Sequence, residues 1–116
     1  MNVAIIGCGL IGRKRALSMP STVNIHTVCD TDVNQGEKLA KEVNADFTID
    51  YNNIISCDKI DVVIISTPNY LIKQIATKAL NSKKHVLSEK PLGKNAVESK
   101  QMTDCAIKNN KILYTG

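Results

Sequence analysis

The fold is decided by the amino-terminal segment VAIIGCGLIG, residues 3–12. Its first four residues form an apolar run, which is typical of a strand buried on both faces. The rest matches the pattern G-x-G-x-x-G, in which a strand turns tightly into a helix whose free N–H groups can face phosphates. We expect Gly7 to permit the turn, Gly9 to let a pyrophosphate approach, and Gly12 to let helix and strand pack closely. The predicted cofactor-binding residues of this glycine loop are Gly7, Gly9, Leu10, Ile11 and Gly12.

Outward from this segment, short apolar runs alternate with helical stretches. The predicted strands are residues 3–6, 23–29, 46–49, 61–66, 85–88 and 111–114. The predicted helices are residues 10–19, 32–43, 52–57, 70–80 and 95–108. Asp32 and Asn95 are expected helix caps, and Gly36 should weaken its helix. Because parallel strands need crossovers, the alternation predicts an α/β fold, a doubly wound and mostly parallel six-stranded Rossmann sheet in three αβα layers. A strand order of 3-2-1-4-5-6 would place a ligand at the carboxyl ends of the strands.

The composition excludes several classes of function. The chain has 116 residues, 43% of them hydrophobic, which fits one domain with a real core. A net charge of +4 with scattered basic residues, and only four aromatic residues, argue against a nucleic-acid partner. The four cysteines have no metal-ligand spacing, so we expect no metal site and a reduced, cytoplasmic protein. No segment is long enough to span a membrane, and we expect no membrane partner.

An acidic residue, Asp30, ends the second predicted strand. A carboxylate there accepts hydrogen bonds from the adenosine ribose and repels a 2′-phosphate, so NAD is the expected cofactor and NADP is disfavoured. Thr31 is assigned to the same site. The alternative is that Asp30 only shapes the turn before Asp32. The basic residues 13–15 could hold a 2′-phosphate, but we interpret them as a solvated helix face.

Polar residues also follow the fourth and fifth predicted strands. Residues 66–69 would face the glycine loop across the crevice, although a proline and a helix cap at Asn69 are also ordinary loop features. Residues 89–91 place an acid and a base at the same edge, where a charge pair on a solvated loop is the alternative. The predicted cofactor contacts from these two loops are Ser66, Thr67, Pro68, Asn69, Glu89 and Lys90.

The motifs at residues 7–12, 67–69 and 84–92 resemble the amino-terminal domain of the Gfo/Idh/MocA family of oxidoreductases. The resemblance covers essentially the whole chain, and its Glu-Lys-Pro signature is much more specific than the glycine motif. It implies hydride transfer between NAD or NADP and a sugar, inositol or related polyol. It also implies that Glu89 contacts the nicotinamide ribose and that Lys90 is catalytic, with its cation hydrogen-bonded to the reacting oxygen and stabilising the developing charge.

This chain departs from the family pattern in two ways. The family often has a histidine where this chain has residues 71–73, Leu-Ile-Lys. Family enzymes also continue into a second domain that forms most of the sugar pocket. We therefore expect residues 1–116 to be the NAD(P)-binding domain of a longer, homo-oligomeric enzyme whose C-terminal substrate domain is absent. The alternative is a stand-alone nucleotide-sensing regulatory domain, of the kind that gates potassium transport, which carries out no catalysis.

Overall fold

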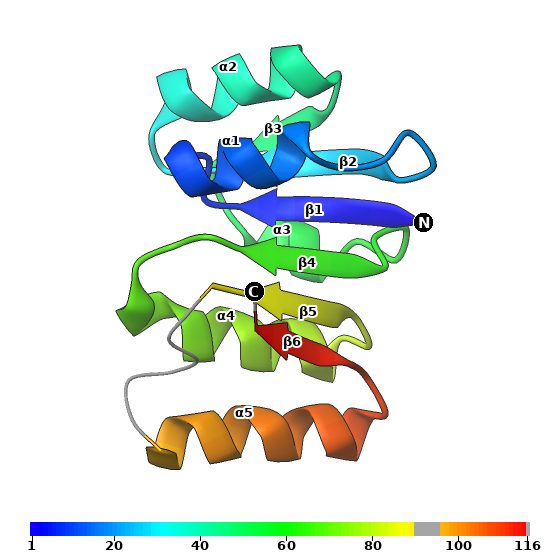
Figure 1. Ribbon diagram of the computed structural model, residues 1–116, viewed down its shortest axis with the longest axis vertical. Helices are drawn as coiled ribbons and strands as arrows, with labels where there is room; N and C mark the ends of the chain where they lie inside the picture. The colour runs from blue at the N-terminus through cyan, green and yellow to red at the C-terminus, as the bar shows by residue number, and fades with distance from the viewer. Residues whose placement is uncertain (90–95, 116) are drawn as a thin grey trace.

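The computed structural model describes residues 1–89 and 96–115. Within them, six strands form one sheet in the order β3-β2-β1-β4-β5-β6, and every neighbouring pair is parallel (Figure 1). The strands are β1 (Asn2–Ile6), β2 (Asn24–Cys29), β3 (Asp46–Thr48), β4 (Val62–Ile65), β5 (His85–Ser88) and β6 (Leu113–Thr115). The helices are α1 (Leu10–Leu17), α2 (Val33–Val43), α3 (Asn52–Ile55), α4 (Asn69–Asn81) and α5 (Ala96–Asn109). The predicted fold class and strand order are thus confirmed, and the sheet is entirely parallel.

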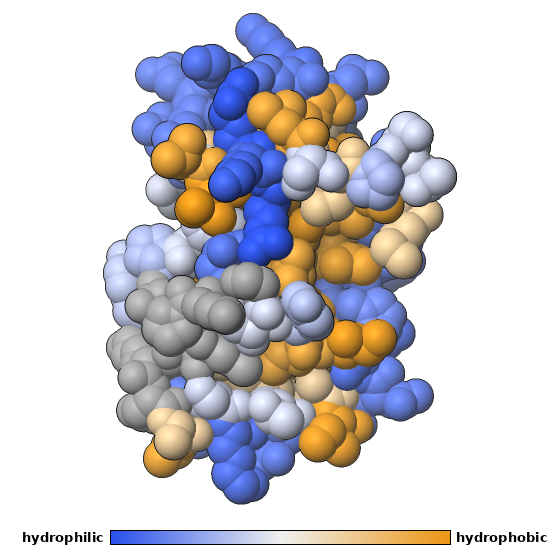
Figure 2. Space-filling model, viewed as in Figure 1, coloured by the Kyte–Doolittle hydropathy of each residue, from blue (hydrophilic) through white to orange (hydrophobic). Residues whose placement is uncertain are grey.

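The strands are apolar because both faces of the sheet are covered. Along β1, Val3 and Ile5 pack into a core with α1 and α2, whereas Ala4 and Ile6 pack into a second core with α4 and α5. Figure 1 shows α1 and α2 beside the β1–β3 half of the sheet and α4 and α5 beside the β4–β6 half. Hydrophilic side chains gather over α2 in Figure 2, as expected for a helix whose apolar face is turned to the sheet.

Several predicted boundaries needed correction. Helix α1 ends at Leu17 instead of residue 19, because the Met19 N–H donates to the Ala16 carbonyl, three residues back, and the i→i−4 pattern stops. Strand β6 starts at Leu113 instead of residue 111, because the Lys111 N–H donates to the Ala106 carbonyl and belongs to the turn that closes α5. In both places the boundary is set by a backbone hydrogen bond that closes the end of a helix, which the apolar pattern does not show.

The predicted helix caps had different outcomes. Asp32 caps α2 as expected, since its carboxylate accepts a hydrogen bond of 3.1 Å from the Gln35 N–H. The prediction of a cap at Asn69 was wrong, because Asn69 is already the first residue of α4 and Pro68 occupies the cap position. The predicted cap Asn95 lies outside the described residues.

Candidate functional site

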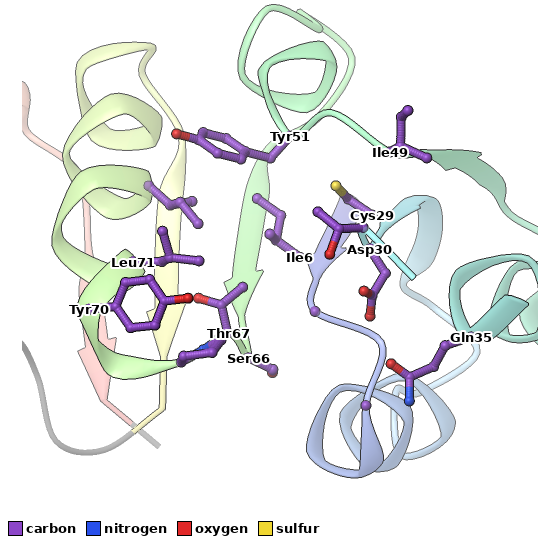
Figure 3. A pocket seen from close by; sticks show the side chains of 15 residues that line it. Ile6, Cys29, Asp30, Gln35, Ile49, Tyr51, Ser66, Thr67, Tyr70 and Leu71 are labelled. Carbon is purple, nitrogen blue, oxygen red and sulfur yellow. The ribbon is translucent and has the colours of Figure 1, made fainter. Parts of the chain in front are cut away.

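The carboxyl ends of β1, β2 and β4 surround a cavity of about 530 Å³ (Figure 3). In Figure 3, Asp30 lies on one side of this cavity, and Ser66 and Thr67 lie on the other. The fold therefore brings together residues from three separate loops of the sequence. The predicted cofactor-binding residues that line the cavity are Gly7, Gly9, Asp30, Thr31, Ser66, Thr67 and Pro68.

The structure gives a different reason for a glycine at each of the three positions of the loop. Gly7 has a φ of +100°, and a Cβ there would lie 2.5 Å from the Ser66 carbonyl oxygen. A Cβ on Gly12 would collide with the carbonyl oxygen of Gly7, so helix and loop touch at that point. A Cβ on Gly9, in contrast, would meet no described atom within 4 Å. The chain itself does not need a glycine at position 9, and the open space there suits a group that approaches from outside.

The Asp30 carboxylate holds the glycine loop to the end of β2. One oxygen, Oδ2, accepts a hydrogen bond of 2.8 Å from the Cys8 N–H, and Oδ1 accepts one of 2.9 Å from the Asp32 N–H. The bond from the Asp32 N–H shows that Asp30 does shape the turn after β2, as the alternative interpretation expected. Because each carboxylate oxygen has two lone pairs, both oxygens can still accept a hydroxyl of a ligand.

On the opposite wall, two buried hydroxyls lack partners. Among residues 1–89 and 96–115, nothing hydrogen-bonds to Ser66 Oγ or Thr67 Oγ1, although neither atom is accessible to solvent. An unpaired buried hydroxyl destabilises the folded chain by about 1–3 kcal/mol. Both residues line the cavity. Because neither hydroxyl is accessible to solvent, a molecule in the cavity can bond to one of them only after that side chain rotates.

The sequence interpretation missed the apolar wall of the cavity. Tyr51 stands at its rim, where its hydroxyl accepts a hydrogen bond of 2.7 Å from Gln74, and the Lys78 ammonium lies 5.4 Å from the ring centroid. The missed lining residues are Ile6, Cys29, Gln35, Ile49, Tyr51, Tyr70, Leu71 and Ile75. Ile49 and Tyr51 follow β3, so the rule that selects carboxyl-end residues would have found them had it been applied to the third strand.

Two thiols lie beneath the glycine loop. Cys8 and Cys29 are buried, and the Cys8 thiol donates to the Cys29 carbonyl at 3.3 Å. Burial, with a smaller contribution from the charge of Asp30, raises the pKa of Cys8 to about 12 and that of Cys29 to about 11. Both therefore stay protonated at neutral pH and act as packing groups. In the part of the chain that the structure describes, no three potential ligand side chains are grouped for a metal ion.

A second hollow of about 340 Å³ lies beside α1. It is lined by Ile11, Lys14, Arg15, Ser18 and Glu89. The Arg15 Nε lies 2.7 Å from Glu89 Oε2. The interpretation of residues 13–15 as a solvated face is therefore wrong for Arg15, although Arg13 and Lys14 are exposed. Sequence spacing cannot show this contact, because the two partners are 74 residues apart.

Two of the other predicted site residues, Leu10 and Gly12, line neither cavity. Leu10 is 81% exposed at the start of α1, and Gly12 is buried in α1 against the Gly7 carbonyl. Asn69 opens α4 next to the cavity residue Pro68. Lys90, the predicted catalytic residue, lies outside the described residues. No described helix is long and apolar enough to cross a membrane.

The sheet order, the glycine loop and the carboxyl-edge cavity define a dinucleotide-type Rossmann domain. The whole chain, residues 1–116, matches the family model GFO_IDH_MocA, described as an oxidoreductase family with an NAD-binding Rossmann fold. The chain therefore belongs to the Gfo/Idh/MocA oxidoreductase family.

Individual relatives agree with this assignment. The chain is 35% identical to 2,7-anhydro-N-acetylneuraminate hydratase of Escherichia coli over 92 residues, which cover 79% of the chain and 25% of the relative. It is 33% identical to levoglucosan dehydrogenase of Pseudarthrobacter phenanthrenivorans over 125 residues, covering 98% of the chain and 32% of the relative. The crystal structure of myo-inositol 2-dehydrogenase from Lactobacillus plantarum superposes with a TM-score of 0.91 at 27% identity, covering 100% of this chain and 36% of that one. The chain thus spans about a quarter to a third of the length of these curated relatives.

Proposed function

We propose that residues 1–116 are the NAD(P)-binding domain of a longer oxidoreductase, which transfers a hydride between a nicotinamide cofactor and a sugar, inositol or related polyol. The observation that carries this proposal is the cavity that joins the open space at Gly9, the Asp30 residue after β2, and Ser66 and Thr67 on the β4 side. The relatives named as dehydrogenases of levoglucosan and myo-inositol support the substrate class.

The residues present fit such a cofactor. Space at Gly9 and the N–H groups at the start of α1 suit the pyrophosphate, and the helix dipole favours its negative charge. Asp30 would accept hydrogen bonds from the adenosine ribose and would repel a 2′-phosphate, which favours NAD over NADP. After a side-chain rotation, the hydroxyls of Ser66 and Thr67 would gain from the cofactor the partners that they lack among residues 1–89 and 96–115.

When bound, the nicotinamide would accept or give the hydride, and this chain would supply the charge around the reacting oxygen. By its resemblance to the family signature, Lys90 is the proposed catalytic residue. Its ammonium would hydrogen-bond the hydroxyl or carbonyl of the substrate and stabilise negative charge as it develops there. Partial removal from water would lower the pKa of a lysine in that place and let it share in proton transfer.

Between the two hypotheses from sequence, the family match favours the oxidoreductase over the nucleotide-sensing domain. The likeness to a hydratase shows that relatives of this chain do not all carry dehydrogenase names. The reaction therefore has to be tested on the full-length protein. We further propose a cytoplasmic, homo-oligomeric enzyme, because all four cysteines are free in the structure and family enzymes commonly associate.

The first test is cofactor binding to the full-length protein by titration calorimetry. We expect Gly9→Val to raise the Kd for NAD at least about tenfold, because the valine fills the space proposed for the pyrophosphate. Lys100→Ala, on the exposed face of α5, is the control and should leave the affinity unchanged. Unchanged affinity in Gly9→Val would remove the proposed site. A screen of polyols and sugars with both NAD and NADP then identifies the substrate.

A further inference from the structure

One ion pair joins α1 to the loop after β5. The Arg15 Nε donates to Glu89 Oε2 at 2.7 Å, and the two side chains are only 30% and 22% exposed. A charged hydrogen bond is stronger than a neutral one, and this pair is shielded from water more than a fully exposed surface pair. The bond to Glu89 is also the main cause that raises the pKa of the Arg15 guanidinium, so the arginine stays charged at any working pH.

The pair uses only one oxygen of the acid. Within residues 1–89 and 96–115, Glu89 Oε2 bonds to Arg15, and Oε1 accepts no hydrogen bond. Glu89 lines the hollow of about 340 Å³ together with Ile11 of the glycine loop. Among the described residues, the carboxylate is therefore held through one oxygen only.

The position of Glu89 along the sheet edge says which part of a dinucleotide it would meet. Asp30 follows β2 on one side of the glycine loop, and Glu89 follows β5 on the other side. The Glu89 N–H donates to the Ile65 carbonyl at 3.3 Å, which fixes this residue next to the end of β4. A dinucleotide with its adenosine ribose at Asp30 and its pyrophosphate at Gly9 extends across β1 and β4 toward Glu89. The second ribose and the nicotinamide of such a dinucleotide would then be on the side of Glu89.

We propose that Arg15 is a positioning residue for the nicotinamide half of the cofactor, and that it acts by holding Glu89 so that Oε1 can accept a hydroxyl of the second ribose. This inference rests on the proposed function. Arg15 lies two turns at most from the glycine loop on the same helix, so the helix that receives the pyrophosphate also orients the acid beyond it. One rigid element would then set the spacing between the two contacts.

The test compares NAD with ADP on the full-length protein, because ADP has the adenosine and pyrophosphate but lacks the second ribose and the nicotinamide. We expect Arg15→Met to raise the Kd for NAD about tenfold and to leave the Kd for ADP within about twofold. Glu89→Gln should raise the Kd for NAD in the same way. The double variant should have a Kd for NAD no higher than that of the single variant with the higher Kd, because Arg15 acts through Glu89. Arg15→Lys, which keeps the charge, should recover part of the affinity for NAD.

Arg13→Met is the matched control. It removes an ion pair of the same length on the same helix, since Arg13 Nη2 lies 2.7 Å from Glu42 Oε2, away from both cavities. It should change neither Kd. The inference is overturned if Arg15→Met weakens the binding of NAD and of ADP equally, which indicates a purely structural role. It is also overturned if Arg15→Met changes neither Kd while Glu89→Gln weakens the binding of NAD. If the unaltered protein binds neither NAD nor NADP, the proposed function fails and this inference fails with it.

Discussion

The two sides of the cofactor cavity differ in how completely the chain satisfies its own polar groups. On the β1–β2 side, Asp30 accepts backbone hydrogen bonds at both oxygens, and the Gly7 N–H donates to the Cys29 carbonyl at 2.8 Å. On the β4 side, the hydroxyls of Ser66 and Thr67 are buried and have no partner among the described residues. On the first side the polar groups are hydrogen-bonded within the folded chain, whereas on the second side two hydroxyls have no hydrogen bond to a described residue.

This difference separates residues that stabilise the shape of the site from residues whose polar groups remain available for a ligand. A loop held by its own hydrogen bonds is already ordered, so little entropy is lost there when a ligand binds. An unpaired buried hydroxyl lowers the stability of the free protein, and a ligand that bonds to it removes that loss. Substitutions of the hydrogen-bonded and closely packed residues on the β1–β2 side should therefore mainly change stability, and substitutions of Ser66 and Thr67 on the β4 side should mainly change ligand binding.

The largest expected effect is at Gly12. Gly12→Ala should lower the free energy of unfolding by at least about 3 kcal/mol, because the new Cβ meets the Gly7 carbonyl oxygen and backbone cannot move aside cheaply. Urea denaturation of the protein measures this. Gly9→Ala is the control, and its Cβ enters open space. Equal losses in the two variants would show that the loop packs differently from the structure.

The next effect is at Asp30. Asp30→Ala should lower the free energy of unfolding by about 2 kcal/mol, because the N–H groups of Cys8 and Asp32 lose a charged acceptor. It should also narrow the preference for NAD over NADP. Asp50→Ala is the matched control, since Asp50 accepts a similar 2.9 Å bond from the Asn52 N–H outside the cavity. If Asp50→Ala costs as much stability, Asp30 has no special role in holding the loop.

The smallest expected effect on stability is at Thr67. Thr67→Val should leave the free protein as stable as before or more stable by about 0.5–1 kcal/mol, because it removes an unpaired buried hydroxyl. Binding of NAD should weaken about threefold. Thr77→Val is the contrast, because the Thr77 hydroxyl donates to the Lys73 carbonyl at 2.6 Å and its loss should destabilise. A clear loss of stability in Thr67→Val would mean that its hydroxyl is already satisfied in the folded protein.

Much of the fold was predictable because the signal is local. Continuous apolar runs such as residues 61–66 identify buried strands, and the stretch 85–88 was placed at its exact bounds as β5. The alternation of strands and helices predicts a parallel sheet with right-handed crossovers, and the glycine motif after the first strand favours the order 3-2-1-4-5-6 that the structure has. The ends of helices were less predictable, because single hydrogen bonds such as that of Lys111 decide them.

Gly36 shows the limit of local reasoning. By propensity it only weakens α2. In the fold, a Cβ at Gly36 would collide with the Phe47 ring, so the glycine lets α2 pack closely on β3. Helix propensity describes a residue within its own helix, whereas the need for a glycine here comes from Phe47, which is eleven positions further along the chain.

By itself, the sequence determined the order of strands and helices, the glycine loop and the carboxylate at the end of β2, because each depends on residues close together in the chain. Only the tertiary structure decided that no described atom lies near a Cβ at Gly9, that no described residue bonds to the hydroxyls of Ser66 and Thr67, and that Arg15 pairs with Glu89. These features are distances between segments far apart in sequence, and a side chain finds its partner only after the sheet has brought those segments to one edge.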